Sequence, residues 1–181
     1  MVRAMSTLHP RTQELLTHLE TRRAELHAAI QSVPKDKQHI RPTPDRWSAA
    51  EVLEHLAIVE SRITGLYTRA VGGIRAKGAA PETDATPILP TIDVNRLIDR
   101  GNRLTASEPS RPTGALSTEQ ALAKLAETRA VLVDALVAGD GLAIGHVTLP
   151  HPALGELNLY QWIAFVGAHE ARHAAQIREL A

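Results

Sequence analysis

The sequence predicts an all-α protein built as a four-helix bundle. Of its 181 residues, 44% are hydrophobic but only 3% are aromatic, and leucine and alanine dominate. These two residues favour helices, whereas β-branched and aromatic residues favour strands. Four separate segments repeat apolar residues at the helical period, and one connection between them is long. Four amphipathic helices with one long crossover connection are typical of such a bundle.

The composition also limits the class of protein. A chain of this length is expected to form a single domain over residues 1–181. It has no cysteine, which excludes disulfides, thiolate metal ligands and a cysteine nucleophile. Twenty basic residues balance twenty acidic ones, so we do not expect nucleic-acid binding. No apolar run reaches the roughly 20 residues that span a bilayer and no secretory signal is visible, so we expect a cytoplasmic protein without membrane contact.

The first two helices are predicted at residues 10–33 and 49–77. Apolar residues recur through the first at the helical period, and Pro10 suits its first turn. The second begins with a capping box, in which the side chains of Ser48 and Glu51 each accept a hydrogen bond from the other residue's backbone N–H group. Both segments therefore carry their own start signal as well as an apolar face.

Two further helices are predicted at residues 118–138 and 158–180. Each begins with a capping box of the same kind, formed by Ser117 with Gln120 and by Asn158 with Gln161. The third helix is predicted to stop before a glycine, a common residue just after a helix.

The long crossover insertion covers residues 78–116 and contains several prolines. A connection of this length without any secondary structure is unusual in a compact domain, so we expect a short helix at residues 93–104. The connection at residues 139–157 is rich in glycine and proline and is expected to be a loop, with a brief extended piece at residues 144–149.

Three histidines lie on the predicted apolar faces of two helices. His169 and His173 are four residues apart, so they project from one face of the last helix. His55 lies between Val52 and Val59 on the apolar stripe of the second helix. Burying a polar group without a partner costs roughly a few kcal/mol, and a shared metal ion provides a partner for all three imidazoles. The pattern therefore favours a metal site formed by these three histidines.

The donor set indicates the kind of metal site. A single histidine on an apolar stripe is more often a hydrogen-bonded core residue than a ligand, but a pair at positions i and i+4 favours ligation. Three neutral imidazoles with open coordination positions match a catalytic zinc site better than a structural one. Zinc and nickel are the ions we expect, and iron, manganese and copper stay open because imidazole suits several divalent ions.

Residues 169–173 also spell the HExxH motif of zincin proteases, in which the glutamate acts as a general base. We discount a protease because Arg172 places a charge where such helices are apolar. No run of strands is predicted that would hold an extended peptide. Glu170 stays a candidate base or a residue that supports a metal ligand. Glu51, one turn before His55, is a weaker candidate because its capping role explains its presence.

Two other residues are weaker candidates for contacts with a ligand. Arg129 lies near the apolar stripe of the third helix, where it can pair with a carboxylate of a bound cofactor, meet an acidic neighbour or reach the surface. His151 lies in the loop before the last helix and can reach the mouth of the bundle, so we expect it on the substrate side of the site.

Two parts of the chain resemble the signatures of one known superfamily. The DinB-like, or YfiT-like, superfamily carries the signature W-S-x-x-E-x-x-x-H-L, which residues 47–56 resemble with WSAAEVLEHL. Its C-terminal signature is resembled by residues 151–155 (HPALG), by residues 161–162 (QW) and by residues 169–177 (HEARHAAQI). The likeness extends to the layout of the whole chain, apart from the middle insertion.

This resemblance implies a four-helix bundle, usually a homodimer, with a metal site of three histidines. The ligands implied are His55, His169 and His173, the same residues that the helical periodicity favours. Members of the superfamily with known activity are mostly transferases or isomerases that depend on bacillithiol, mycothiol or glutathione, and others are described as metal-dependent hydrolases.

Three functions are consistent with such a site. In the first, a metal-dependent transferase or isomerase holds a low-molecular-weight thiol as thiolate, which attacks a small electrophilic substrate. In the second, a metal-dependent hydrolase lowers the pKa of bound water to about 7 and produces hydroxide. In the third, a non-catalytic module binds the metal for stability or sensing. We expect the first.

Overall fold

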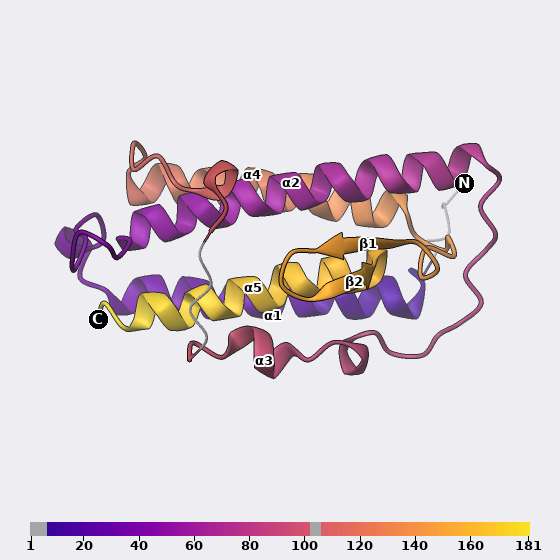
Figure 1. Cartoon of the computed structure of the whole chain (residues 1–181), viewed down its shortest axis with the longest axis horizontal. Coiled ribbons are helices and arrows are strands. Elements are labelled where there is room, and N and C mark those ends of the chain that lie inside the picture. Colours follow the sequence, from indigo (N-terminus) through magenta and orange to yellow (C-terminus); the bar gives the residue numbers. More distant parts are fainter. Residues whose placement is uncertain (1–6, 102–105) are drawn as a thin grey trace, which may run out of the picture.

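Four long helices dominate the computed structural model, which describes residues 7–101 and 106–181 (Figure 1). They are α1 (Pro10–Ser32), α2 (Ala49–Ala76), α4 (Thr118–Ala138) and α5 (Leu159–Arg178). Each of their ends lies within about two residues of the predicted position, and the three predicted capping boxes are all formed. The predicted all-α fold class is confirmed. No helix within the described ranges is both long enough and apolar enough to cross a membrane.

The shorter elements differ more from prediction. They are the 3-10 helices η1 (Lys35–Lys37), η2 (Leu89–Thr91) and η3 (Glu108–Ser110), the helix α3 (Val94–Ile98) and the strands β1 (Thr148–His151) and β2 (Gly155–Asn158). The prediction of a helix at residues 93–104 is wrong in length, because α3 ends at Ile98. The chain leaves helical geometry at Asp99, whose carbonyl accepts a hydrogen bond from Arg172. The rest of that prediction falls on residues 102–105, outside the described ranges.

The connection before α5 forms an antiparallel hairpin rather than a loop with one extended piece. Strand β1 pairs with β2 from Thr148 opposite Asn158 to His151 opposite Gly155. Gly155 has a φ of 75°, a left-handed conformation that glycine adopts without strain. The extended piece predicted at residues 144–149 therefore overlaps only the start of β1, and β2 was not predicted.

The helices pack as two pairs, α1 with α5 and α2 with α4. Figure 1 shows that α2 and α4 run in the same direction, because the crossover returns along the whole bundle beneath α1 and α5 before α4 begins. Parallel neighbours of this kind require a long connection, which explains the size of the insertion. The hairpin β1–β2 runs along the bundle beside the first half of α5, which β2 contacts (Figure 1).

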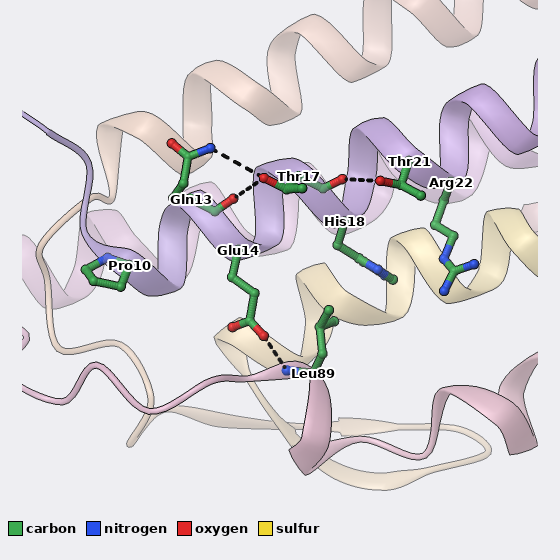
Figure 2. A pocket seen from close by; sticks show the side chains of 8 residues that line it. All are labelled: Pro10, Gln13, Glu14, Thr17, His18, Thr21, Arg22 and Leu89. Carbon is green, nitrogen blue, oxygen red and sulfur yellow. Dashed lines mark hydrogen bonds between the residues drawn. The ribbon is translucent and has the colours of Figure 1, made fainter.

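Ion pairs and hydrogen bonds attach the crossover to the start of α1. Arg11 binds the carboxylates of Glu82 and Asp84 and the backbone carbonyl of Thr86. One turn later, the Glu14 carboxylate accepts hydrogen bonds from the backbone N–H groups of Ile88 and Leu89, at 2.7 and 3.2 Å. Figure 2 shows the bond to Leu89. These contacts order a segment that has little regular structure of its own.

A ring of four charges, two buried glutamates and two half-buried arginines, joins the four long helices. Arg23 of α1 and Arg129 of α4 both bind Glu60 of α2, at 3.1 and 3.0 Å, and both bind Glu170 of α5. Glu60 and Glu170 are 3% and 1% exposed. Each carboxylate therefore bridges two guanidinium groups, which satisfies the charge of groups that would be costly to bury alone.

The packing of α1 against α5 at His18 depends on a glycine. The buried His18 ring donates a hydrogen bond from Nε2 to the carbonyl of Ala164, at 3.1 Å, and points toward α5 (Figure 2). A Cβ atom added at Gly167 would lie 2.3 Å from that Nε2 atom, well inside van der Waals contact. Only a residue without a side chain fits at this position.

We predict that Gly167→Ala destabilises the metal-free protein by about 1–3 kcal/mol, because the ring and the helix must move apart. The control is Gly73→Ala in α2, where a new Cβ meets nothing within 4 Å. That change should stabilise the protein by up to about 1 kcal/mol, since alanine is the better helix former. Denaturant unfolding of both variants measures the difference, and equal effects would contradict the close packing at His18.

Candidate metal centre

The structure brings three histidines together between α2 and α5. The Nε2 atom of His169 lies 3.3 Å from Nε2 of His55 and 3.1 Å from Nε2 of His173. One ligand atom from each residue lies within 4.8 Å of the others. His169 and His173 are adjacent because they are one turn apart on α5, whereas His55 reaches them only through the packing of α2 against α5. These three side chains can hold a metal ion.

Hydrogen bonds at Nδ1 of His55 and His173 define which nitrogen of each ring is available to bind a metal. Nδ1 of His55 lies 2.6 Å from the carbonyl oxygen of Ser110, and this oxygen can only accept, so Nδ1 carries the proton. Nδ1 of His173 likewise donates to the side-chain oxygen of Gln176, at 2.8 Å, and Arg100 donates to the same oxygen. Both rings therefore turn an unprotonated Nε2 lone pair toward His169.

This arrangement fits a divalent cation. Two nitrogens that each lie about 2.1 Å from one ion are about 3.4 Å apart at a tetrahedral angle and about 3.0 Å apart at a right angle. The observed separations of 3.3 and 3.1 Å fall in this range. A proton on Nε2 of His169 can satisfy only one of the two facing lone pairs well. The bonds from Nδ1 to a carbonyl and to an amide oxygen are the kind that orient histidine ligands.

Burial keeps the three imidazoles neutral. It lowers the pKa of His55, although the bond to Ser110 opposes this shift. It also lowers the pKa of His169 and of His173 well below the ordinary value of 6.5, and repulsion between the neighbouring rings adds to the effect. Neutral imidazole is the form that binds a metal, so the folded chain holds its candidate ligands in the correct protonation state.

The triad lines a cavity of about 980 Å³. Trp47 packs against His55 with ring centroids 4.9 Å apart, and Phe165 stacks on His169 at 5.3 Å. A cavity of this size accommodates a small organic molecule beside the histidines. The protein supplies three candidate ligands, and the remaining coordination positions of a bound ion would face this space.

His151 lies on the wall of the same cavity. The sequence analysis expected it on the substrate side of the site. Its ring packs against Phe165 and Trp162, with centroids 4.4 and 5.0 Å apart. Its Nδ1 accepts a hydrogen bond from the backbone N–H of Ala153, which leaves Nε2 as the protonated nitrogen of the neutral ring. Burial lowers its pKa. A role in binding substrate stays a prediction.

The other sequence candidates lie outside the cavity and are bound to other groups. Both carboxylate oxygens of Glu170 accept from arginines, one from Arg23 and one from Arg129. For Arg129 the sequence left three alternatives, a cofactor carboxylate, an acidic neighbour or the surface. The structure shows the second, because Arg129 binds Glu60 and Glu170 in the charge ring. Glu51 caps α2 and binds Arg41 through both oxygens. The structure does not bring any of these three candidates to the histidines.

Several residues that support the site were not predicted. The Ser110 carbonyl could not be found from the sequence, because a backbone group carries no residue signal and lies 55 positions from His55. Glu54 holds the same segment by accepting hydrogen bonds from Thr113 and Gly114. Gln176 carried a usable signal, since it follows His173 by three residues on one helical face.

A four-helix bundle in which two helices supply three converging histidines defines a class of helical metal-site proteins. The model of the family described as the DinB superfamily matches residues 18–177, which include all three histidines. The chain therefore belongs to the DinB superfamily, as its signatures predicted. It is similar to the uncharacterized protein YuaE of Bacillus subtilis (strain 168), with 28% identity over 159 residues that cover 87% of this chain and 91% of that protein. No solved structure matches the chain.

We predict that Gln176→Ala weakens zinc binding about tenfold without removing a ligand, because His173 loses the group that orients its ring. Gln13→Ala, an exposed glutamine on α1, is the matched control and should bind zinc normally. Competition with a chromophoric chelator measures both affinities. Unchanged affinity in Gln176→Ala would mean that the bond to Nδ1 does not position the ligand.

We also predict that the metal-free protein loses stability as the pH falls below about 6.5. Above that pH the three imidazoles are neutral in both the folded and the unfolded chain, so they add no pH dependence. Below it the unfolded chain takes up protons first, because the folded pKa values of His55, His169 and His173 are lowered. Acid therefore favours unfolding.

Thermal melting at about pH 7.5 and about pH 5.5 in the presence of a chelator measures this loss. His173→Gln should lose less stability between the two conditions, since one lowered pKa is removed. His27→Gln, at an exposed position on α1, should behave like the unmodified chain. A loss of equal size in all three proteins would exclude the triad as its source.

Proposed function

We propose that this protein is a metal-dependent enzyme that activates a low-molecular-weight thiol for transfer to, or isomerisation of, a small electrophilic substrate. The observation that carries the proposal is the convergence of three neutral Nε2 donors on one wall of a large cavity. Three protein ligands beside open space are typical of catalytic rather than structural metal sites. A divalent ion bound there would stabilise a thiolate by coordination.

The chain's own residues have separate tasks in this proposal. His55, His169 and His173 bind the ion, while the Ser110 carbonyl and Gln176 orient two of their rings. The aromatic rings of Trp47 and Phe165 line the cavity and offer apolar surface to a substrate. Trp162 packs behind them, against Phe165 and His151.

The environment of the carboxylates favours thiol chemistry over hydrolysis. A thiolate needs no protein base once it is coordinated, whereas a hydrolase commonly uses a carboxylate to position and deprotonate water. Glu170 and Glu51, the two carboxylates expected in that role, do not line the cavity, and both are bound to arginines. Zinc and nickel are the proposed ions, and a cytoplasmic homodimer is the proposed state of the enzyme.

We predict that His55→Ala abolishes tight zinc binding, since two remaining imidazoles make a poor site. Zinc should raise the melting temperature of the unmodified chain, because an ion bound only by the folded state stabilises it, and this rise should disappear in the variant. Glu170→Gln should keep its zinc but lose about 3 kcal/mol of stability, as it breaks the buried charge ring. Full metal content in His55→Ala would place the site elsewhere.

Activity assays separate the proposed function from the hydrolase. The zinc- or nickel-loaded protein is mixed with glutathione and 1-chloro-2,4-dinitrobenzene, and in parallel with p-nitrophenyl acetate without thiol. Conjugation that requires both metal and His55 supports the transferase. Ester hydrolysis that a thiol inhibits supports the hydroxide mechanism instead, and neither activity across a panel of thiols and esters supports the non-catalytic module.

A further inference from the structure

We propose that the molecule bound in this cavity is a small carboxylate, and that its carboxylate pairs with Arg111 while another of its groups reaches the histidine triad. This inference rests on the proposed function, since it names the chemical class of the ligand for the same site. It follows from the distribution of charge around the cavity and from the contacts that each charge makes.

The charged residues that line the cavity are strongly biased toward arginine. Among the described residues of the lining, the basic side chains are Arg41, Arg46, Arg100, Arg111 and Arg172, and the acidic ones are Asp45 and Glu179. The whole chain has equal numbers of basic and acidic residues, so this excess is local. Neutral imidazoles with a divalent ion would add further positive charge. A cavity of this kind attracts anions and disfavours cations.

Most of these arginines already have acidic or backbone partners. Arg46 and Arg100 share the Glu179 carboxylate, with N–O distances of 2.7 and 3.0 Å. Arg41 binds Glu51 through two nitrogens. Arg172, which is 6% exposed, donates to the backbone carbonyl of Leu97 at 3.3 Å and to that of Asp99. These groups shape the positive field but are held by the protein itself.

Arg111 is different from the others. Arg111 lines the cavity and is exposed to solvent, and its side chain forms no hydrogen bond or ion pair with any residue in the described ranges. Its backbone follows directly after Ser110, whose carbonyl accepts the hydrogen bond from His55. The free guanidinium is therefore attached to the same short segment that orients a candidate metal ligand, on the α2 side of the cavity.

The chemistry of guanidinium defines the matching ligand. A guanidinium group pairs with a carboxylate through two parallel N–H···O bonds, and this geometry gives direction as well as energy. A single uncommitted guanidinium matches the single charge of a carboxylate better than a phosphate ester, which carries about two charges at neutral pH. A thiol that also bears a carboxylate would satisfy both the triad and Arg111.

The test compares thiols that differ in charge. 3-Mercaptopropionate, which bears one carboxylate, and the neutral 3-mercapto-1-propanol are titrated into cobalt-substituted protein, in which a bound thiolate produces a charge-transfer absorption band. 3-Mercaptopropionate should bind roughly tenfold more tightly, the expected gain from one charge-assisted pair. Arg111→Gln should remove most of this preference while leaving 3-mercapto-1-propanol binding and cobalt content unchanged.

The matched control is Arg69→Gln, which removes the same charge from an exposed position on α2. Arg69 lies about four turns beyond His55, roughly 20 Å along the helix, where salt screens its field. This variant should keep the full preference for 3-mercaptopropionate. An equal loss in both variants would show a general effect of net charge and would overturn the role of Arg111.

Calorimetry with the zinc protein separates this inference from the proposed function. Propionate should bind in a manner that depends on Arg111, and the neutral propionamide should not. If propionate binds in this way but no thiol produces the cobalt band, the thiol function fails and the anion site stands. If both thiols produce the band with equal affinity in the unmodified protein and in Arg111→Gln, the anion site fails and the thiol function stands. Inorganic phosphate that competes better than propionate would overturn the assignment to a carboxylate.

Discussion

Two arginines and two glutamates form a closed ring at the centre of the bundle, and each of the four long helices supplies one of them. Burying such charges costs several kcal/mol per ion, which mutual attraction offsets only when the geometry is good and each group is paired. Burial lowers the pKa of Arg129, but the ion pairs with Glu170 and Glu60 outweigh this effect and leave it raised. We infer that the ring sets the rotation of each helix about its own axis, since any other rotation would leave a buried charge unpaired.

The rotation of two helices decides whether the histidines meet. Glu170 directly precedes Ala171 in the turn that carries His169 and His173, so fixing the glutamate toward α1 and α4 turns both histidines toward α2. Glu60 of α2 is likewise bound by Arg23 of α1 and Arg129 of α4, and this contact turns His55 of the same helix toward α5. The HExxH motif is thus divided between two tasks here. Its histidines face the cavity and its glutamate holds the bundle, which is a different use of the motif from that in a zincin protease.

The segments between the helices build the rest of the site. Ser110, the last residue of η3, holds His55 through its carbonyl, and Glu54 of α2 binds the segment that follows at Thr113 and Gly114. The hairpin brings His151 to the cavity wall, and the crossover places Arg100 beside Gln176. Binding residues commonly lie on loops that a rigid scaffold positions, and the bundle has this role here. The long insertion therefore contributes directly to the candidate site.

The sequence by itself determined the features that depend on neighbours along the chain. Capping boxes, helical periodicity and the i, i+4 pair of His169 and His173 are local, so the four helices and their apolar faces were predicted nearly to the residue. The triad could be proposed because His55 lies on an apolar stripe, and the superfamily signature implied the same three residues.

Only the tertiary structure decided which distant groups meet. It paired Arg129 with Glu60 and Glu170 rather than with a ligand, and it left the Arg111 side chain at the cavity without a partner among the residues that the structure describes. The sequence carries no periodic signal for such contacts, because they depend on the path of the crossover and on helix rotation rather than on spacing along one element. The bounds of the short elements were not predicted correctly for a related reason. A helix of five residues or a four-residue strand is stabilised mainly by its tertiary contacts, and local propensity alone does not determine where it begins and ends.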